Sequence, residues 1–238
     1  MKYIDATFPS PAENLAWDEA FLDRCEAGDG GETLRFWEAH EPFAVVGYAN
    51  HAAREVNLAA CWTHGIPVFR RCSGGGTVLQ GPGCLSYSLI LRIREHGPFH
   101  AIASTNAFIM QRHQTAIAKL LNAPVHIQGH TDLAVNNLKF SGNAQRRRRH
   151  FLIFHGTFLL NFDLTLIERF LQMPSKQPDY RQERTHSEFL TNLNLPATTV
   201  KSALREIWDA HEPLADLPPG QIPALAEKYA TDAWNFKF

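Results

Sequence analysis

The residues best suited to chemistry form an arginine pair that runs into a glycine-rich loop. Three glycines in a row let a backbone approach a ligand closely, and successive free N–H groups can bind an anion. Arginine guanidinium groups bind phosphate or carboxylate in a two-pronged geometry. The segment therefore indicates an anion site, although a flexible turn with two solvated arginines fits it too. Its residues are Arg70, Arg71, Cys72, Ser73, Gly74, Gly75, Gly76 and Thr77.

Lys139 is a second candidate, because small residues including Gly142 and Ala144 follow it and Asp132 precedes it. An ammonium group beside an anion site can neutralise charge that develops on oxygen during acyl or phosphoryl transfer. The alternative is a solvated lysine on an edge strand. The run Arg146–Arg149 comes directly after. It fits a solvated loop, a site for a nucleotide phosphate, or a surface that attracts an acidic partner.

His155, Gly156 and Thr157 interrupt the apolar run 151–160. A histidine inside such a strand is commonly a hydrogen-bonded core residue. Glycine within a strand marks close approach by another group, so a ligand beside His155 is the other interpretation.

The bulk composition excludes several classes of protein. Lys and Arg total 23 against 24 Asp and Glu in 238 residues, so the whole chain is not an evident nucleic-acid or membrane binder. The four cysteines show neither a CxxC pair nor zinc-site spacing, and they read as reduced, mostly buried thiols. Cys84 is a candidate nucleophile, but a small buried thiol is the favoured interpretation. With no signal peptide and no membrane-length apolar run, the sequence predicts a soluble cytoplasmic protein.

The candidate site residues must be positioned by helices and strands, whose sequence patterns follow one another without strict alternation. We expect helices over about 11–25, 57–64, 106–121, 164–171, 187–192, 198–209 and 224–229. We expect strands over 33–37, 43–48, 66–71, 86–93, 125–128, 132–135, 138–140 and 151–161. In the first helix, apolar residues share one face and acidic residues the other. Asn136 and Asn137 predict a two-residue hairpin turn. The mixture predicts an α+β fold with a mostly antiparallel or mixed sheet.

Several motifs in this order resemble the lipoate–protein ligase A family, within the wider group of biotin and lipoate protein ligases. The family pattern is an arginine pair with a Ser-Gly-Gly-Gly loop, a Lys-x-Ser/Ala-Gly-x-Ala segment, and a His-Gly-Thr strand. Here these read RRCSGGGTV, LKFSGNAQRR and FHGTFLL. The segments ENLAWDEA, FAVVGYAN, EVNLAA and KYATDAWNF are also similar, and the likeness covers roughly residues 14–238.

The resemblance implies a fold and a two-step reaction. A central mixed β-sheet flanked by helices would hold the ligand in a cleft. Lipoate and Mg²⁺-bound ATP would give an enzyme-bound lipoyl-adenylate and pyrophosphate. A lysine amine of an acceptor lipoyl domain, of the 2-oxoacid dehydrogenase or glycine-cleavage type, would then attack and release AMP.

The resemblance also implies roles for particular residues. Lys139 matches the family lysine that contacts the acyl carbonyl and phosphate, as an electrostatic stabiliser. Asp132 falls where the family has an acidic residue near the nucleotide and its Mg²⁺. The remaining residues match segments that line the acyl and adenylate pocket: Arg70, Arg71, Ser73, Gly74, Gly75, Gly76, Thr77, Gly142, Asn143, Ala144, His155 and Thr157.

Two departures from the family keep other activities open. The chain, expected to be a single catalytic domain over 1–238, ends before a C-terminal accessory domain, so adenylation would need a separate accessory-domain protein or proceed weakly. The family's His-Asp after the glycine-rich loop is replaced by Gln80 and Gly81. The alternatives are an octanoyl or lipoyl transferase that uses a carrier-bound donor and a cysteine thioester, and a non-catalytic lipoate-binding protein. The loop 128–131, where such a cysteine would lie, contains none, which favours the ligase.

Overall fold

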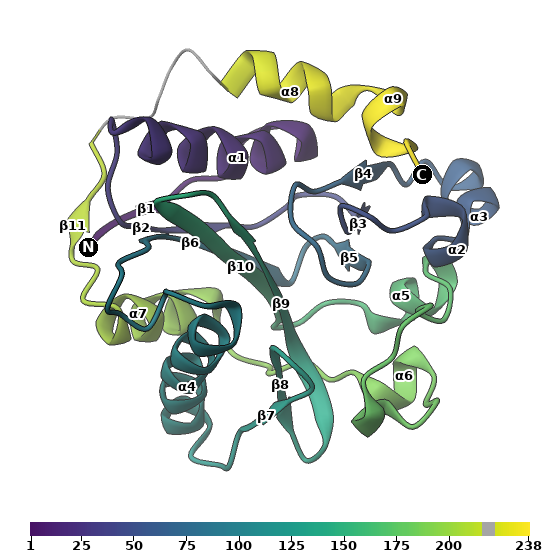
Figure 1. Ribbon diagram of the computed structural model, residues 1–238. Coiled ribbons are helices and arrows are strands. Elements are labelled where there is room, and N and C mark those ends of the chain that lie inside the picture. Colours follow the sequence, from purple (N-terminus) through teal and green to yellow (C-terminus); the bar gives the residue numbers. More distant parts are fainter. Residues whose placement is uncertain (216–221) are drawn as a thin grey trace.

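The structure, a computed structural model, describes residues 1–215 and 222–238 (Figure 1). Its strands are β1 Lys2–Asp5, β2 Thr33–Trp37, β3 Phe43–Val46, β4 Val68–Arg70, β5 Val78–Gln80, β6 Cys84–Arg92, β7 His126–Gln128, β8 Asp132–Val135, β9 Leu138–Arg147, β10 Phe151–Leu159 and β11 Glu212–Pro213. Its α-helices are α1 Pro11–Ala27, α2 Ala52–Glu55, α3 Leu58–Thr63, α4 Ile102–Leu121, α5 Leu164–Phe170, α6 His186–Phe189, α7 Ala197–Ile207, α8 Ile222–Ala230 and α9 Asp232–Asn235.

Two sheets divide these strands. The larger has the order β11-β1-β2-β6-β10-β9-β8-β7, with β1 parallel to both neighbours and antiparallel pairing from β2 onward. The smaller has the order β4-β3-β5, with β4 parallel and β5 antiparallel to β3. Helices cover both faces of the large sheet, with α1 and α8 on one side and α4 and α7 on the other (Figure 1). The predicted α+β fold with a central mixed sheet is confirmed.

Helix α1 connects the large sheet to α8. Ser10 and Glu13 form a capping box at its start, with Pro11 in the first turn. Trp17 and Phe21 pack with Ile90 and Ile153 of the sheet. Two of the acidic residues expected on the other face, Asp18 and Glu19, are buried. Helix α8 covers the outer side of α1, so both faces of the helix lie inside the protein.

The two sheets have separate apolar cores. The core beneath the large sheet joins strands β2, β6, β9 and β10 to α4 and α7, and its members include Leu89, Met110, Phe158 and Val200. A second core packs the small sheet against α3 and α5. The space between the two sheets is closed from one side by α1, whose first turns contact β3 and β4 residues.

The basic run departs from the solvated-loop interpretation. Strand β9 extends through Arg147, beyond the expected end near residue 140, and pairs with β10. Arg146 donates to the Cys72 carbonyl at 3.0 Å and lies 3.4 Å from Glu19. Arg147 donates to the Phe99 carbonyl and Arg148 pairs with Asp23 at 2.6 Å. These arginines therefore join β9 to neighbouring elements, because intramolecular acceptors lie within reach of each.

Most expected elements are present with shifted ends, and the Asn136-Asn137 turn is confirmed by positive φ at both residues. The sequence patterns did not predict β1, α2, β5, α9 or β11. Part of the Pro-rich stretch before the last helices, Pro218 and Pro219, lies outside the described residues. Among the residues that are described, no helix has the length and apolar character needed to cross a bilayer.

Candidate functional site

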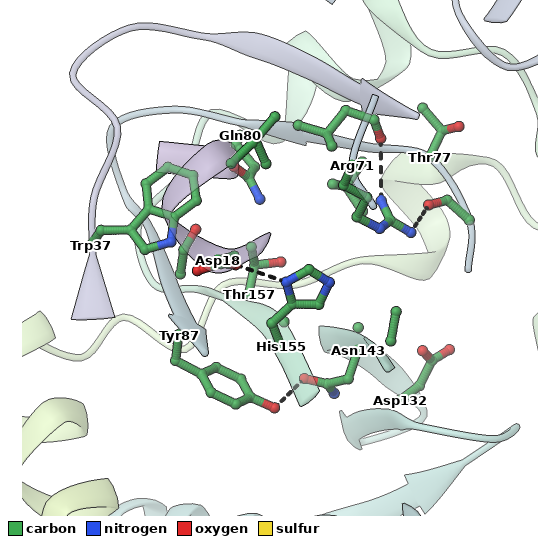
Figure 2. A pocket seen from close by; sticks show the side chains of 18 of the residues that line it. Asp18, Trp37, Arg71, Thr77, Gln80, Tyr87, Asp132, Asn143, His155 and Thr157 are labelled. Atoms are coloured by element: carbon green, nitrogen blue, oxygen red, sulfur yellow. Dashed lines mark hydrogen bonds and ion pairs between the residues drawn. The ribbon is translucent and has the colours of Figure 1, made fainter. Parts of the chain in front are cut away.

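A cavity lies between the two sheets, at the glycine-rich loop (Figure 2). Its walls come from α1, from β3 and β5 with the loop between β4 and β5, and from β2, β6, β8, β9 and β10 of the large sheet. The lining residues are Leu15, Asp18, Trp37, Val45, Arg71, Gly76, Thr77, Val78, Gln80, Ser86, Tyr87, Asp132, Lys139, Gly142, Asn143, Ala144, His155, Gly156 and Thr157. Segments more than 100 residues apart in the sequence therefore meet at one site.

Arg71 shapes the glycine-rich loop from inside. Its guanidinium donates to the carbonyls of Gly74 and Gly76, both at 2.6 Å, and to the hydroxyl of Ser73 at 3.1 Å. Burial lowers the pKa of Arg71 to about 10, so the side chain stays charged at neutral pH. The loop is therefore wrapped around a buried cation, which Figure 2 shows facing the cavity beside Thr77.

Arg70 lies outside the cavity. Its guanidinium donates to the carbonyls of Gly47, Tyr48, Asn50, Trp234 and Asn235. These acceptors belong to the segment after β3 and to α9, so Arg70 fastens the end of the chain to the small sheet. The structure also leaves Ser73, Gly74 and Gly75 just outside the cavity wall, while it brings the other expected site residues together along that wall.

Lys139 and Asp132 form an ion pair at the cavity, with 2.8 Å between Nζ and Oδ1. The second carboxylate oxygen of Asp132 accepts a hydrogen bond from the Tyr180 hydroxyl at 2.9 Å. Gly142 makes room for the ammonium group, because a Cβ atom there would lie 2.9 Å from Lys139 Nζ. The small residue three positions after the lysine is thus required by the path of the lysine side chain.

A hydrogen-bonded chain runs from α1 through β10 to the glycine-rich loop. Asp18 lies 2.9 Å from His155 Nδ1 (Figure 2). His155 Nε2 lies 2.6 Å from the Ser73 hydroxyl. Arg35 and Ser88 also donate to Asp18, at 3.0 and 2.8 Å. Burial acts to raise the pKa of Asp18, but the His155 hydrogen bond and the Arg35 charge outweigh it and lower that pKa. Asp18 is therefore a buried carboxylate that orients His155.

Asn143 and Gly156 lie opposite each other where β9 pairs with β10. The Asn143 amide accepts from the Tyr87 hydroxyl and donates to the Thr131 carbonyl. A Cβ atom at Gly156 would lie 1.8 Å from the Asn143 side-chain oxygen and 2.6 Å from the Gly142 carbonyl. Glycine at 156 therefore allows the Asn143 side chain to turn across β10 toward Tyr87.

A second cavity adjoins the first and shares Gly76, Thr77, Val78, Lys139, Gly142 and Thr157 with it. Its remaining walls are largely apolar and come from β5, α5 and α6, with Arg181 and His186 as basic groups. The apolar members include Leu79, Leu159, Ile167, Leu171 and Phe189. Lys139 thus stands where two hollows meet, with its ammonium accessible from both.

All four thiols are buried, and none of them lines either cavity. Burial raises the pKa of Cys72 and Cys84 to about 12, and likewise that of Cys25. A thiol with such a pKa is almost entirely protonated at neutral pH and is a poor nucleophile. The expectation that Cys84 is a small buried thiol is confirmed.

The described residues contain no group of three or more His, Cys, Asp or Glu side chains that could hold a metal ion. The acidic side chains that line the first cavity are Asp132 and Asp18. The Asp18 carboxylate is already hydrogen-bonded to Arg35, Ser88 and His155. Mg²⁺ commonly binds one or two carboxylates while substrate phosphates and water complete its shell. Asp132 fits that limited role.

Several cavity residues were not predicted from the sequence, and the polar or aromatic ones among them include Asp18, Trp37 and Tyr87. Each sits in an apolar run, where a single polar or aromatic residue looks like part of the core. The adjacent acidic pair Asp18-Glu19, set between the apolar stretches 15–17 and 20–22, was the available signal, because buried carboxylates must each have a partner. Glu19 finds its partners in Lys228 and Tyr229, at 2.7 and 2.9 Å.

Comparison with known proteins gives consistent matches along the chain. Residues 10–206 match the family described as the lipoyl protein ligase A/B catalytic domain. The chain is 25% identical to octanoyltransferase LipM of Geobacillus kaustophilus, over 99% of the chain and 98% of that protein. It is 29% identical to lipoate–protein ligase 1 of Staphylococcus aureus, over 99% of the chain and 73% of that protein.

Solved structures share the fold at lower sequence identity. A lipoate–protein ligase A bound with ATP superposes with a TM-score of 0.78 and 22% identity, covering 99% of both chains. A bipartite lipoate protein ligase of Thermoplasma acidophilum, studied with its E2 lipoyl domain, gives 0.80 and 20% identity, covering 99% of this chain and 95% of that one.

Proposed function

Because the chain belongs to the lipoyl protein ligase A/B catalytic-domain family, we propose that it is an ATP-dependent lipoate–protein ligase. The family's curated relatives include both ligases and octanoyltransferases. In the proposed reaction, a carboxylate oxygen of lipoate attacks the α-phosphorus of ATP and pyrophosphate leaves. The ε-amine of an acceptor lysine then attacks the acyl carbonyl carbon, loses its proton, and AMP leaves.

The two adjoining cavities can hold different parts of an acyl-adenylate. The first has Trp37, Val45 and Tyr87 in its wall, and these side chains can pack against an acyl chain. The second has a more apolar wall that also includes Arg181 and His186, which suits a nucleoside. The acyl phosphate would then lie between them, beside Lys139. Its ammonium would stabilise negative charge on the carbonyl and phosphate oxygens in both steps.

Bound Mg²⁺ would neutralise phosphate charge, and Asp132 would be one of its ligands or would hold Lys139 in place. The ion pair at 2.8 Å sets the position of the ammonium before substrate arrives. Arg71 holds the glycine-rich loop, so that Gly76 and Thr77 line both cavities at the same point. His155, oriented by Asp18, presents one edge of its ring to the acyl cavity.

The position of the cysteines favours a ligase over a transferase that forms an acyl-cysteine thioester. A transferase that forms an acyl-cysteine needs a thiolate within reach of the acyl carbonyl. Here no thiol lines either cavity, and burial raises the pKa of Cys72 and Cys84 to about 12. Activation by ATP avoids the need for such a group, because AMP is itself a good leaving group.

Octanoyl transfer from a carrier-bound donor is the second candidate. The observation that favours it is the full-length match to octanoyltransferase LipM, of which the alignment covers 98%. In that reaction the acyl group would pass from a carrier thioester to the acceptor lysine without ATP. A protein that binds lipoate without turnover is the remaining alternative.

The test is intact-mass analysis of an apo lipoyl domain, of the 2-oxoacid dehydrogenase or glycine-cleavage type, after incubation with this protein. One reaction contains lipoate, ATP and Mg²⁺, and the other contains octanoyl-carrier protein without ATP. The ligase predicts modification in the first reaction alone, and Lys139→Ala should reduce its rate by about 100-fold or more. Modification in the second reaction alone would establish the transferase.

If both reactions leave the acceptor unmodified, addition of a separate accessory-domain protein to the first reaction distinguishes a ligase that needs a partner from a binding protein. Lipoate binding without turnover, even with that partner, would contradict the ligase. The Lys139→Ala variant should keep the wild-type melting temperature, because its side chain is partly exposed and packs at a cavity.

A further inference from the structure

Gln80 places an unpartnered amide at the wall of the acyl cavity. The residue is only 7% exposed, and its Oε1 is buried without any hydrogen-bond partner. Within the part of the chain that the structure describes, its Nε2 has no hydrogen-bond partner either. Figure 2 shows the amide nitrogen of Gln80 pointing into the cavity, on the side where Trp37 lies.

A buried amide without hydrogen-bond partners destabilises the folded protein, because burial removes its hydrogen bonds to water and no protein group replaces them. The neighbours of Gln80 on this wall are mostly apolar, including Trp37, Val45 and Val78. The backbone of Gln80 is fixed by pairing with Phe43 in the small sheet. The side chain therefore cannot leave the wall easily, and its amide is available to a group that enters the cavity.

The position of Gln80 identifies which part of a ligand it would meet. Lys139 lines both cavities and so marks the end of the first cavity that adjoins the second, and Asp132 is paired with it there. Gln80 lines the first cavity but not the second. In Figure 2 it lies across the cavity from Asp132. An acyl chain whose carboxylate lies at Lys139 would therefore bring its distal end toward Gln80 and Trp37.

We propose that Gln80 is a specificity-determining residue that recognises a sulfur-bearing ring at the distal end of the acyl chain. This inference rests on the proposed function. The amide N–H donates to a ring sulfur, which accepts hydrogen bonds weakly, and the ring packs on Trp37. A plain hydrocarbon tail of the same length offers no acceptor and leaves the amide unpaired. Gln80 therefore favours lipoyl over octanoyl substrates.

Gly81 completes this arrangement. A Cβ atom at Gly81 would lie 3.1 Å from both Phe162 and the Pro42 backbone. Residue 81 therefore packs tightly against the turn that precedes β3, which holds the end of β5 close to the cavity. The pair Gln80-Gly81, where the family resemblance leads one to expect His-Asp, is then a local adaptation of the acyl site.

The test measures binding of lipoate and octanoate by calorimetry, without ATP, to the wild-type protein and to Gln80→Met. Methionine has nearly the shape of glutamine but has no N–H donor. We expect the preference for lipoate over octanoate to fall about tenfold in Gln80→Met, chiefly through tighter octanoate binding. Gln111→Met, on the exposed face of α4, is the matched control and should keep the wild-type preference.

A second measurement uses only the wild-type protein and so does not depend on the folding of a variant. The probe is 5-cyclopentylpentanoate, in which carbon replaces both ring sulfurs of lipoate. We expect it to bind about tenfold more weakly than lipoate. Equal affinity for the two acids, or an unchanged preference in Gln80→Met, would overturn the role of Gln80 while leaving the ligase intact. Wild-type protein that binds neither lipoate nor octanoate would overturn the proposed function and this inference together.

Discussion

At the scale of single residues, the site depends on where one ammonium group can lie. Lys139 lines both cavities, pairs with Asp132 at 2.8 Å, and passes over Gly142. A lysine in a strand does not by itself indicate a position at a cavity. The sequence indicated this position only through the small residues that follow Lys139, and the structure explains one of these, Gly142.

Gly142→Ala should displace the ammonium without unfolding the protein. The added Cβ would lie 2.9 Å from both Nζ and Cε of Lys139, which is the flexible end of that side chain. We expect stability to change little and the transfer rate to fall about 10- to 100-fold, measured by acceptor mass over time. Gly74→Ala is the control, since nothing lies within 4 Å of a Cβ there. Equal rates in the two variants would refute this role for Gly142.

The cysteines should be dispensable for acyl transfer. Cys72→Ala and Cys84→Ala remove the two thiols nearest the glycine-rich loop in sequence, and burial raises the pKa of both to about 12. We expect transfer rates within about threefold of wild type once any loss of folded protein is taken into account. Intact mass of the enzyme should also show no acyl adduct. An adduct that disappears in one of these variants would instead reveal a thioester intermediate.

At the scale of elements, Asp18 joins α1 to three strands of the large sheet. Its carboxylate contacts Arg35 of β2, Ser88 of β6 and His155 of β10. Arg35 is fully buried, so loss of the Asp18 charge would leave an uncompensated cation inside the protein. This one side chain therefore links the stability of the fold to the orientation of a cavity histidine.

Asp18→Asn should lower the free energy of unfolding by about 3 kcal/mol or more at neutral pH, measured by urea denaturation. The pKa of Asp18 is lower in the folded protein than its usual 3.8, so the folded state favours the ionised form. Its contribution is therefore full above about pH 5 and is lost as the pH falls below the usual pKa. The difference between wild type and variant should shrink accordingly on acidification. A difference that stays constant down to pH 3 would exclude this linkage.

Elements with strong patterns were predictable, while elements that depend on tertiary contacts were not. Helix α4 and strand β10 have long periodic runs, and the Asn136-Asn137 turn has a local conformational cause. Strand β9 was cut short in the prediction because a run of arginines resembles a loop. Its pairing with β10 and the acceptors around Arg146 and Arg147 come from distant parts of the chain. Arg70 appeared to be a ligand contact for the same reason, since its backbone acceptors are invisible in sequence.

At the scale of the whole molecule, helices α8 and α9 are bonded to elements on either side of the cavity. Arg70 donates to the carbonyls of Trp234 and Asn235 in α9, and Glu19 accepts from Lys228 and Tyr229 in α8. Both connections reach elements next to the cavity. The end of the chain therefore supports the wall that carries the glycine-rich loop.

Arg70→Gln should act on stability more than on acyl binding. The substitution leaves several buried carbonyls without donors, and we expect a loss of about 3 kcal/mol or more in the free energy of unfolding. Lipoate affinity of the folded variant, measured well below its melting temperature, should stay within about threefold of wild type. A variant of wild-type stability that no longer binds lipoate would show that Arg70 is a ligand contact after all.

Oxygen labelling tests most directly whether the proposed ligase activates a carboxylate with ATP. Lipoate carrying ¹⁸O in both carboxylate positions is incubated with the protein, Mg²⁺-bound ATP and an apo lipoyl domain, and the AMP is analysed by mass spectrometry. We expect AMP that carries one ¹⁸O atom, because a carboxylate oxygen becomes the bridge to phosphorus and leaves with AMP. Lipoylated acceptor accompanied by unlabelled AMP, or by none, would contradict it.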